Sequence, residues 1–149
     1  MSSLKGIRSV KIPGVPDNHV AAPKRVNTLR QHLRPGVTIG ISGDACAGLG
    51  LNAGCEVWYS VCGGLFPETA KYITQAAAAS DNERVTALTT ELNPLWALFR
   101  QHGGSIRVIA AATGLLGLTD ADCLPRTLLP LSAGDIAAVA RVIAELDLK

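Results

Sequence analysis

The spacing of hydrophobic residues predicts three short strands, each followed by a helix, in the first half of the chain. The strands are predicted over residues 6–12, 37–42 and 56–61. The middle segment, VTIGIS, is almost continuously apolar, which is typical of a strand buried on both faces in a parallel sheet. Apolar residues recur at helical spacing between and after the strands, which predicts helices over residues 20–33, 45–53 and 67–79. Because tight loops join these alternating elements, we predict parallel strands with right-handed crossovers.

The second half of the chain changes to helices alone. They are predicted over residues 81–101, 105–116 and 133–146, with a mostly irregular segment over 119–131. Pro94 predicts a kink within the first of them, because proline removes a backbone donor. Ser132 is suited to cap the last helix, with Asp135 three residues further on. The chain therefore divides into residues 1–80, which carry the strands, and residues 81–149, a C-terminal helical region.

The order of the elements indicates which α/β fold contains them. Three β-α units are too few for a complete (β/α)8 barrel, which has eight strands and about 250 residues. A free three-stranded parallel sheet would leave two unprotected edges. The order fits the last three β-α units of a TIM (β/α)8 barrel, a partial barrel, followed by a C-terminal helical bundle. The alternative is a small flavodoxin-like ligand-binding domain, which requires helices on both faces of the sheet, whereas a barrel segment has them on one face only.

Composition excludes several classes of function. The chain has 149 residues, of which 48% are hydrophobic and 17% charged, and this predicts a folded domain. A formal net charge of +2 is too small to indicate nucleic-acid or membrane-surface binding, and no apolar segment reaches the length of a membrane span. The cysteines lack the spacing of zinc ligands, which favours free thiols in a reducing cytoplasm and no metal site. They are Cys46, Cys55, Cys62 and Cys123.

Lys11 lies near the end of the first predicted strand, between Val10 and Ile12. In a parallel barrel the carboxyl ends of the strands carry the active site. A lysine that is desolvated there releases its proton more easily, and a neutral amine can attack a ketone to form an imine. From the residues alone, a lysine whose ammonium group reaches solvent at the strand end is the simpler explanation. Both interpretations stay open at this level.

Turns rich in glycine and small residues follow the second and third strands. Ser42-Gly43-Asp44 follows the second strand, and the segment from Trp58 to Pro67 covers the end of the third and the turn after it. Glycine allows a backbone to approach a ligand closely, and backbone N–H groups in such turns can bind a carboxylate. Asp44 is also suited to cap the helix that follows. Ordinary β-α turns need glycine for geometry alone, so neither turn by itself indicates a binding site.

Together with Lys11, these turns resemble the dihydrodipicolinate synthase and N-acetylneuraminate lyase family. The resemblance rests first on Val10-Lys11-Ile12-Pro13, on Ile41-Ser42-Gly43-Asp44, and on the segment from Gly54 to Glu68. It continues through the helical region in Pro94-Leu95-Trp96, Gly103-Gly104 with Arg107, Leu115-Leu116-Gly117-Leu118, and Arg126 to Pro130, where the family's proline is absent at Leu128. It covers nearly the whole chain, in the order and spacing of the family.

The resemblance implies a lyase of the class I aldolase type that works through a lysine Schiff base. Lys11 would be the Schiff-base lysine on the sixth barrel strand, and Ser42 and Gly43 would lie beside the bound keto acid after the seventh. Tyr59 would offer its main-chain carbonyl to the pyruvyl group after the eighth. The substrate would be pyruvate or a related 2-keto acid, which undergoes condensation, cleavage or dehydration without a metal or organic cofactor. Homo-oligomers are expected for the full-length family.

Three residues depart from the family's pattern: Val57 replaces a glycine, Tyr59 an aliphatic residue and Gly64 an asparagine. The ring of Tyr59 would reshape the pocket without removing a backbone contact. The family's catalytic tyrosine and its Thr-Thr carboxylate-binding turn belong to earlier strands, and neither Tyr59 nor Tyr72 matches the catalytic position. The alternative is therefore a catalytically inactive truncated remnant of such an enzyme, or a chain that needs a partner chain.

Overall fold

The structure is a computed structural model that describes residues 6–120 and 123–149. The chain divides into two compact units. The first contains the described residues up to Ser60 together with Lys71–Thr89, and it holds the sheet. The second contains Val61–Ala70 and Thr90–Lys149, and it is built from helices.

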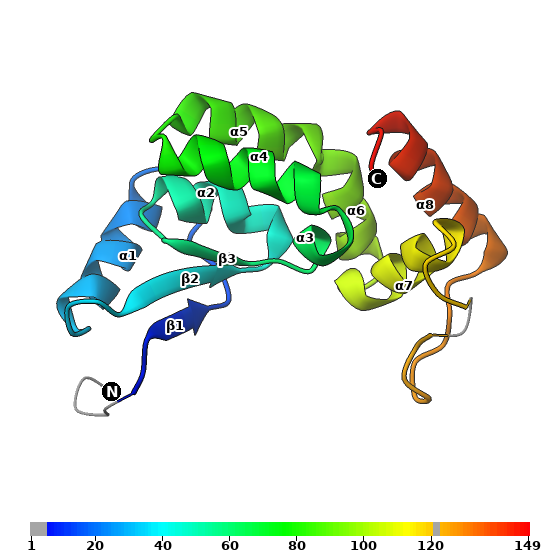
Figure 1. Ribbon diagram of the computed structural model, residues 1–149, viewed down its shortest axis with the longest axis horizontal. Helices are drawn as coiled ribbons and strands as arrows, with labels where there is room; N and C mark the ends of the chain where they lie inside the picture. The colour runs from blue at the N-terminus through cyan, green and yellow to red at the C-terminus, as the bar shows by residue number, and fades with distance from the viewer. Residues whose placement is uncertain (1–5, 121–122) are drawn as a thin grey trace. The chain divides into compact units, whose positions relative to one another are not determined.

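A three-stranded parallel sheet forms the centre of the first unit (Figure 1). Its strands β1 (Ser9–Ile12), β2 (Thr38–Ser42) and β3 (Val57–Tyr59) lie side by side in sequence order. Lys11 pairs with Gly40 across the first two strands, and Ser42 pairs with Tyr59 across the last two. Side chains alternate along a strand, so the register divides the sheet into two faces. The apolar face carries Val10, Ile12, Ile39, Ile41 and Trp58, and the mostly polar or small face carries Ser9, Lys11, Thr38, Gly40, Ser42, Val57 and Tyr59.

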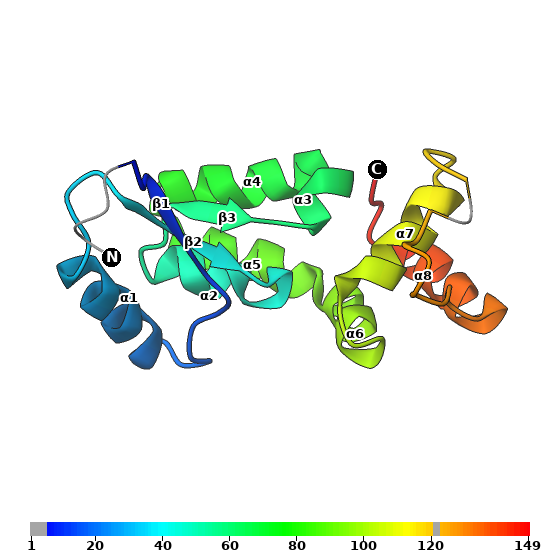
Figure 2. The ribbon, with the colours of Figure 1, turned by 90° about the horizontal axis from the view of Figure 1, so that it is seen from below.

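Helices cover the apolar face of the sheet. The elements that follow the strands are α1 (Ala21–Gln31), the 3₁₀ helix η1 (Asp44–Cys46), α2 (Ala47–Asn52), and most of α4 (Pro67–Ala78) and of α5 (Asn82–Glu91). Ala22 and Val26 of α1 join Ile12, Ile39 and Ile41 in one buried cluster. Burying an isoleucine or valine side chain fully contributes about 1.5–3 kcal/mol, so this cluster decides which face the helices cover. Figure 2 shows α5 alongside α2, where Thr89 lies against Gly48.

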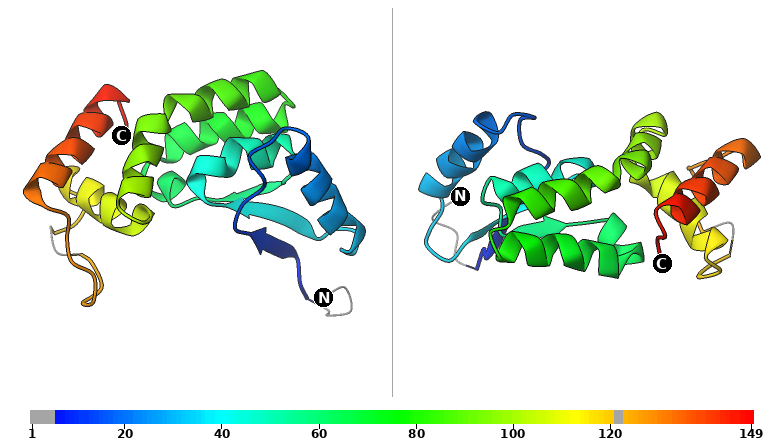
Figure 3. Two further views of the ribbon diagram at one scale, coloured as in Figure 1. Left: turned by 180° about the vertical axis from the view of Figure 1, so that it is seen from behind. Right: turned by 90° about the horizontal axis from the view of Figure 1, so that it is seen from above.

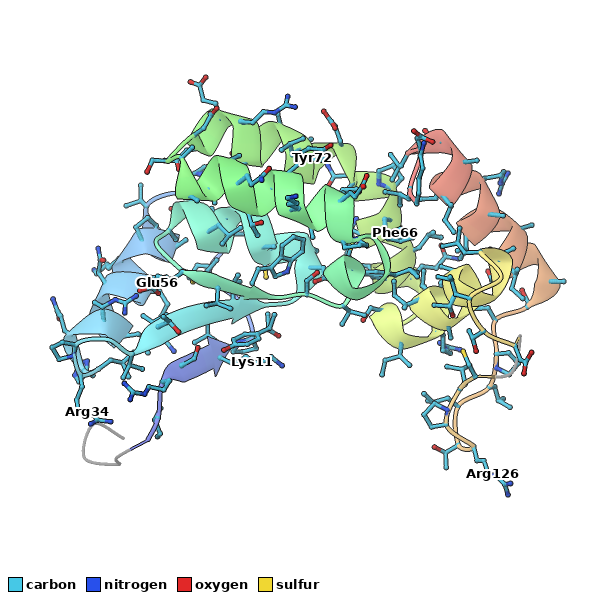
Figure 4. The ribbon with its side chains drawn as sticks, in the orientation of Figure 1. Lys11, Arg34, Glu56, Phe66, Tyr72 and Arg126 are labelled. Atoms are coloured by element: carbon cyan, nitrogen blue, oxygen red, sulfur yellow. The ribbon has the colours of Figure 1, made fainter. Side chains whose placement is uncertain are left out.

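An ion pair ties α1 to the amino ends of the strands. Arg30 pairs with Glu56, and a second guanidinium nitrogen donates to the Val37 carbonyl at 2.7 Å. The other carboxylate oxygen of Glu56 accepts a hydrogen bond of 2.8 Å from the backbone N–H of Ile39. Figure 4 shows Glu56 at the start of β3, while Lys11 stands at the carboxyl end of β1. This ion pair therefore lies at one end of the sheet and the predicted site residues at the other.

The second unit is a small helical core. Its helices are α3 (Cys62–Leu65), α6 (Asn93–Gln101), α7 (Ser105–Leu115) and α8 (Ala133–Glu145), and Figure 3 shows α7 alongside α8. Trp96 and Phe99 on α6 are buried with their ring centroids 5.5 Å apart. Val108 on α7 and Val139 on α8 are fully buried. Each helix thus buries one apolar face, as the sequence pattern predicts for the C-terminal helical region.

Local differences from the predicted elements have simple causes. The kinked helix predicted over 81–101 is wrong: Pro94 lies in the first turn of a separate helix, α6, where its missing N–H costs little. Asp44 is not the predicted cap, because it lies within η1 and Gly43 precedes it. The short helix α3 forms in a glycine-rich segment where the sequence predicts only a turn after the third strand. The cap at Ser132 is confirmed, since its hydroxyl accepts a hydrogen bond of 3.2 Å from the N–H of Asp135.

Candidate functional site

Lys11 lies on the polar face of the sheet, one residue before the end of β1. Its side chain is exposed, which agrees with the simpler of the two interpretations, a lysine whose ammonium group reaches solvent at the strand end. The reason is that β1 is an outer strand and Lys11 points away from the hydrophobic cluster. The amine is therefore accessible to a small molecule that approaches the carboxyl ends of the strands.

The turn after β2 lies against the backbone that follows Lys11. Gly43 has a φ of +86°, which side-chain-bearing residues rarely adopt. A Cβ at this position would also come within 3.0 Å of the Pro13 carbonyl oxygen and 3.3 Å of the Cys46 sulfur. Only glycine allows the two chain segments to approach so closely. The Ser42–Gly43 turn and the end of β1 therefore meet at one edge of the sheet.

A buried carboxylate ties the same turn to β3. Asp44 is the buried charged residue of the described chain, with 6% of its surface exposed. Its Oδ1 accepts a hydrogen bond of 3.1 Å from the indole N–H of Trp58. Because Trp58 immediately precedes Tyr59, this bond couples the position of the Gly43 turn to the end of β3. The sequence pattern did not reveal this pair.

Tyr59 stands on the same face as Lys11, and 40% of its surface is exposed. Its hydroxyl donates a hydrogen bond of 2.6 Å to Ser9 Oγ, and Ser9 Oγ in turn donates to the Thr38 carbonyl at 3.4 Å. The ring lies over Gly40, where an added Cβ would come within 2.7 Å of Tyr59 Cδ2. A phenol ring thus crosses the polar face from β3 to β1.

Cys46 supports the turn from the side of the helices. Its thiol donates to the Gly43 carbonyl at 3.1 Å and lies 3.5 Å from the Ser42 carbonyl. Burial raises the pKa of the Cys46 thiol, which keeps it protonated and able to donate. No group of three His, Cys, Asp or Glu side chains that could hold a metal ion occurs among residues 6–120 and 123–149.

The predicted site residues lie apart from a groove in the first unit. A groove of about 660 Å³ lies elsewhere in the first unit, lined by α1, α2 and α5 residues that include Pro23, Asn52 and Thr86. None of the four predicted site residues lines it. In the part of the chain that the structure describes, no helix is both long and apolar enough to cross a membrane.

Comparison with solved structures gives consistent matches. The chain is 36% identical to dihydrodipicolinate synthase from Agrobacterium tumefaciens, with a TM-score of 0.89 over 97% of this chain and 48% of that one. It is 20% identical to dihydrodipicolinate synthase from Thermotoga maritima, with a TM-score of 0.84 over 99% and 48%. The chloride-inhibited enzyme from Acinetobacter baumannii, complexed with pyruvate, is 16% identical, with a TM-score of 0.75 over 93% and 45%. No protein-family model and no curated protein matches the chain.

The chain belongs to the dihydrodipicolinate synthase family. It corresponds to the C-terminal part of the family's fold and spans about half the length of the solved structures that it matches. The predicted partial barrel is confirmed, and the flavodoxin-like alternative is wrong. The two matches below 25% identity support this fold. Membership assigns the chain to a family of class I aldolase lyases.

The dihydrodipicolinate synthase fold gathers the four predicted site residues in one unit, at the carboxyl ends of three neighbouring strands. Lys11 comes from β1, Ser42 and Gly43 from β2 and its turn, and Tyr59 from β3. Their roles in binding and catalysis stay predictions. Gly40 and Ser9 contact Tyr59 and were missed, although a glycine within an apolar strand is a known sign of a close approach.

Proposed function

We propose that the chain acts in a class I aldolase reaction in which Lys11 forms a Schiff base with pyruvate or a related 2-keto acid. The observation that carries this proposal is the close approach of the Gly43 turn to the Pro13 carbonyl, two residues after the exposed Lys11. Membership of a family of aldolase-type lyases supports it. Lys11 is the described lysine that lies on the polar face of the sheet.

The chemistry begins with the neutral amine of Lys11. Its nitrogen attacks the keto carbon, water leaves, and a protonated imine forms. The imine withdraws electrons from the neighbouring carbon, which loses a proton and becomes the nucleophilic end of an enamine. That carbon adds to an aldehyde, and hydrolysis of the resulting imine releases the product and restores the amine. The reverse sequence is a cleavage, and neither direction involves net oxidation or reduction.

Groups at the carboxyl ends of β2 and β3 are suited to hold the rest of the keto acid. The Ser42 hydroxyl and the backbone N–H groups of the Gly43 turn are donors of the kind that bind a carboxylate. The main-chain carbonyl of Tyr59 is assigned to face the pyruvyl group. The solved Acinetobacter baumannii enzyme, which shares this fold, was complexed with pyruvate, and this supports pyruvate as the first keto acid to test.

We also propose that the chain works in the cytoplasm as part of a homo-oligomer, with residues 1–80 forming the catalytic barrel portion and 81–149 the helical portion. Four free cysteines support a reducing compartment. Sedimentation velocity of the purified chain tests the assembly. A single species of monomer mass at all concentrations would contradict it.

Borohydride trapping tests the Schiff base directly. The purified 149-residue chain is incubated with pyruvate, reduced with sodium borohydride and digested, and mass spectrometry locates the carboxyethyl adduct. We expect the adduct on Lys11. Lys11→Arg keeps the charge but removes the nucleophilic amine, so it should abolish labelling. Lys24→Arg is the matched control, because Lys24 is an exposed lysine on α1.

The outcome also separates the alternatives. An adduct on Lys11 with pyruvate but none with lactate, which has no keto group, supports the proposal. Equal labelling of Lys11 and Lys24 would indicate unspecific amine chemistry and would contradict it. A folded chain that gives no adduct at all would favour the inactive remnant, or a chain that needs a partner.

A further inference from the structure

We propose that Tyr59 is a positioning residue for the amine of Lys11; the inference rests on the Schiff-base function proposed above. The strand register places the two side chains on the same face of the sheet. Lys11 pairs with Gly40, and Tyr59 pairs with Ser42 two residues further along the same strand. Side chains two residues apart on a strand share a face. Lys11 and Tyr59 therefore rise from the same face of the sheet.

The direction of the Tyr59 side chain places its ring next to the Lys11 side chain. The ring runs back from the end of β3 and lies directly over Gly40, close enough that an added Cβ would fall 2.7 Å from Cδ2 and closer still to Cε2. Gly40 is the residue that pairs with Lys11, and neighbouring strands lie about 4.8 Å apart. The ring therefore occupies the space beside the Lys11 side chain on its β2 side.

A hydrogen bond fixes the far end of the ring. The Tyr59 hydroxyl donates to Ser9 Oγ at 2.6 Å, and Ser9 stands on β1 two residues before Lys11. The ring is thus held at its Cα on β3 and at its hydroxyl on β1. It closes the polar face on the side toward the amino ends of the strands. Lys11 is left free to extend toward the carboxyl ends, where Ser42 and Gly43 lie.

This geometry indicates that the ring of Tyr59, rather than its hydroxyl proton, positions the amine of Lys11. The phenol directs its proton to Ser9, away from the carboxyl ends where a keto acid would bind. A flexible lysine side chain has much rotamer freedom to lose when it is ordered. A fixed ring beside its stem removes part of that freedom before the substrate arrives, which favours a productive approach to the keto carbon.

Two readouts on the same samples test the inference. The first is the rate of borohydride-trapped adduct on Lys11 over a range of pyruvate concentrations. The second is competitive acetylation by acetic anhydride, in which peptide mapping compares Lys11 with Lys24 and Lys71, two exposed lysines on helices. The variants are Tyr59→Leu, Tyr59→Phe and Ser9→Ala. Tyr72→Leu is the matched control, because Tyr72 is exposed on α4 (Figure 4).

Removal of the ring should move the two readouts in opposite directions. We expect Tyr59→Leu to lower the maximal trapping rate about tenfold with a smaller change in half-saturation, since a misplaced group loses rate. Acetylation of Lys11 relative to Lys24 and Lys71 should rise, because its stem loses a neighbour. Tyr59→Phe keeps the ring and should recover most of the trapping rate. Ser9→Ala frees only the Tyr59 hydroxyl. It should therefore change the trapping rate and the acetylation of Lys11 slightly, each in the same direction as Tyr59→Leu.

The results separate this inference from the function on which it rests. If wild type gives no adduct but Tyr59→Leu raises Lys11 acetylation, the Schiff-base function fails and the positioning stands. If relative acetylation of Lys11 is the same in every folded variant, the positioning is overturned whatever the adduct shows. If Tyr59→Leu does not fold, Tyr59→Met, which also removes the ring, is compared with Tyr59→Phe, which keeps it. Equal relative acetylation of Lys11 in these two variants overturns the inference.

Discussion

The indole N–H of Trp58 donates a hydrogen bond of 3.1 Å to the carboxylate of Asp44, which keeps 6% of its surface exposed. This bond joins β3 to the turn after β2. A buried carboxylate is stable only while its oxygens have donors, so a lost donor costs more than the average hydrogen bond. The pair therefore contributes to stability and to the position of Gly43 at the same time.

Trp58→Phe removes this donor and leaves most of the aromatic surface. We expect the free energy of unfolding to fall by about 1–3 kcal/mol, because one partner of a buried charge is lost. Urea unfolding followed by circular dichroism measures the change. Tyr72→Phe is the control, since Tyr72 is 59% exposed and should change little. Equal stability of Trp58→Phe and wild type would show that Asp44 does not depend on the indole.

Gly43→Ala tests the turn beside Lys11. We expect a loss of about 1–3 kcal/mol of stability from the left-handed backbone, and a further loss from the contact with the Pro13 carbonyl at 3.0 Å. Lys11 trapping by pyruvate should also fall. Gly54→Ala is a matched control: its φ is +101°, but the nearest side-chain atom to an added Cβ is 3.8 Å away.

The comparison of these two glycines isolates the steric contact from the backbone strain. Gly54→Ala should lose stability by strain alone and leave trapping at Lys11 unchanged, because it precedes β3 at the amino end of the strand. Identical losses of stability and of trapping in both variants would mean that the turn has no particular relation to Lys11.

Much of the first unit follows from local pattern, while its side-chain contacts do not. Alternation around Val10 and Ile12 and the apolar run through Ile39 and Ile41 predict β1 and β2, because these residues need one covered face. The turn glycine at Gly43 is also visible in the sequence. The packing of Tyr59 on Gly40 is not, since it joins residues far apart in sequence and depends on the register of three strands.

Errors in the prediction have the same origin. Asp44 is a reasonable cap by its position, but a more favourable partner, the indole of Trp58, lies on another strand. A proline such as Pro94 is compatible either with a kink within a helix or with the first turn of a new one. Because α5 ends at Glu91, Pro94 lies in the first turn of α6. The sequence leaves the exposure of Lys11 open because its neighbours are apolar, and β-sheet alternation then determines the face on which it lies.

The Cys55 thiol makes the stability of the fold depend on pH. Burial, with the nearby Glu56 charge as the second cause, raises the pKa of Cys55 from 9.0 to about 11. The folded chain therefore disfavours the thiolate more than the unfolded chain does. The resulting stability is complete below about pH 9 and is lost as pH rises toward about pH 11.

Cys55→Ala should flatten this part of the pH profile. The variant loses some stability at every pH, because a buried sulfur is removed, but its stability should fall less steeply between about pH 9 and pH 11. Urea midpoints at several pH values measure the slope. Cys123→Ala, at an exposed cysteine, should keep the wild-type slope. Equal slopes in wild type and Cys55→Ala would show that Cys55 is not the source of the pH dependence of stability.

Ser132→Ala tests the start of α8 in the second unit. The Ser132 hydroxyl accepts from the Asp135 N–H at 3.2 Å and donates to the Asp135 carboxylate at 2.6 Å. Loss of such a cap costs about 1 kcal/mol, so the urea midpoint should fall. Ser132→Asp retains an acceptor near a helix N-terminus, and should recover most of the loss. A midpoint for Ser132→Asp as low as that for Ser132→Ala would mean that the cap contributes nothing to the stability of α8.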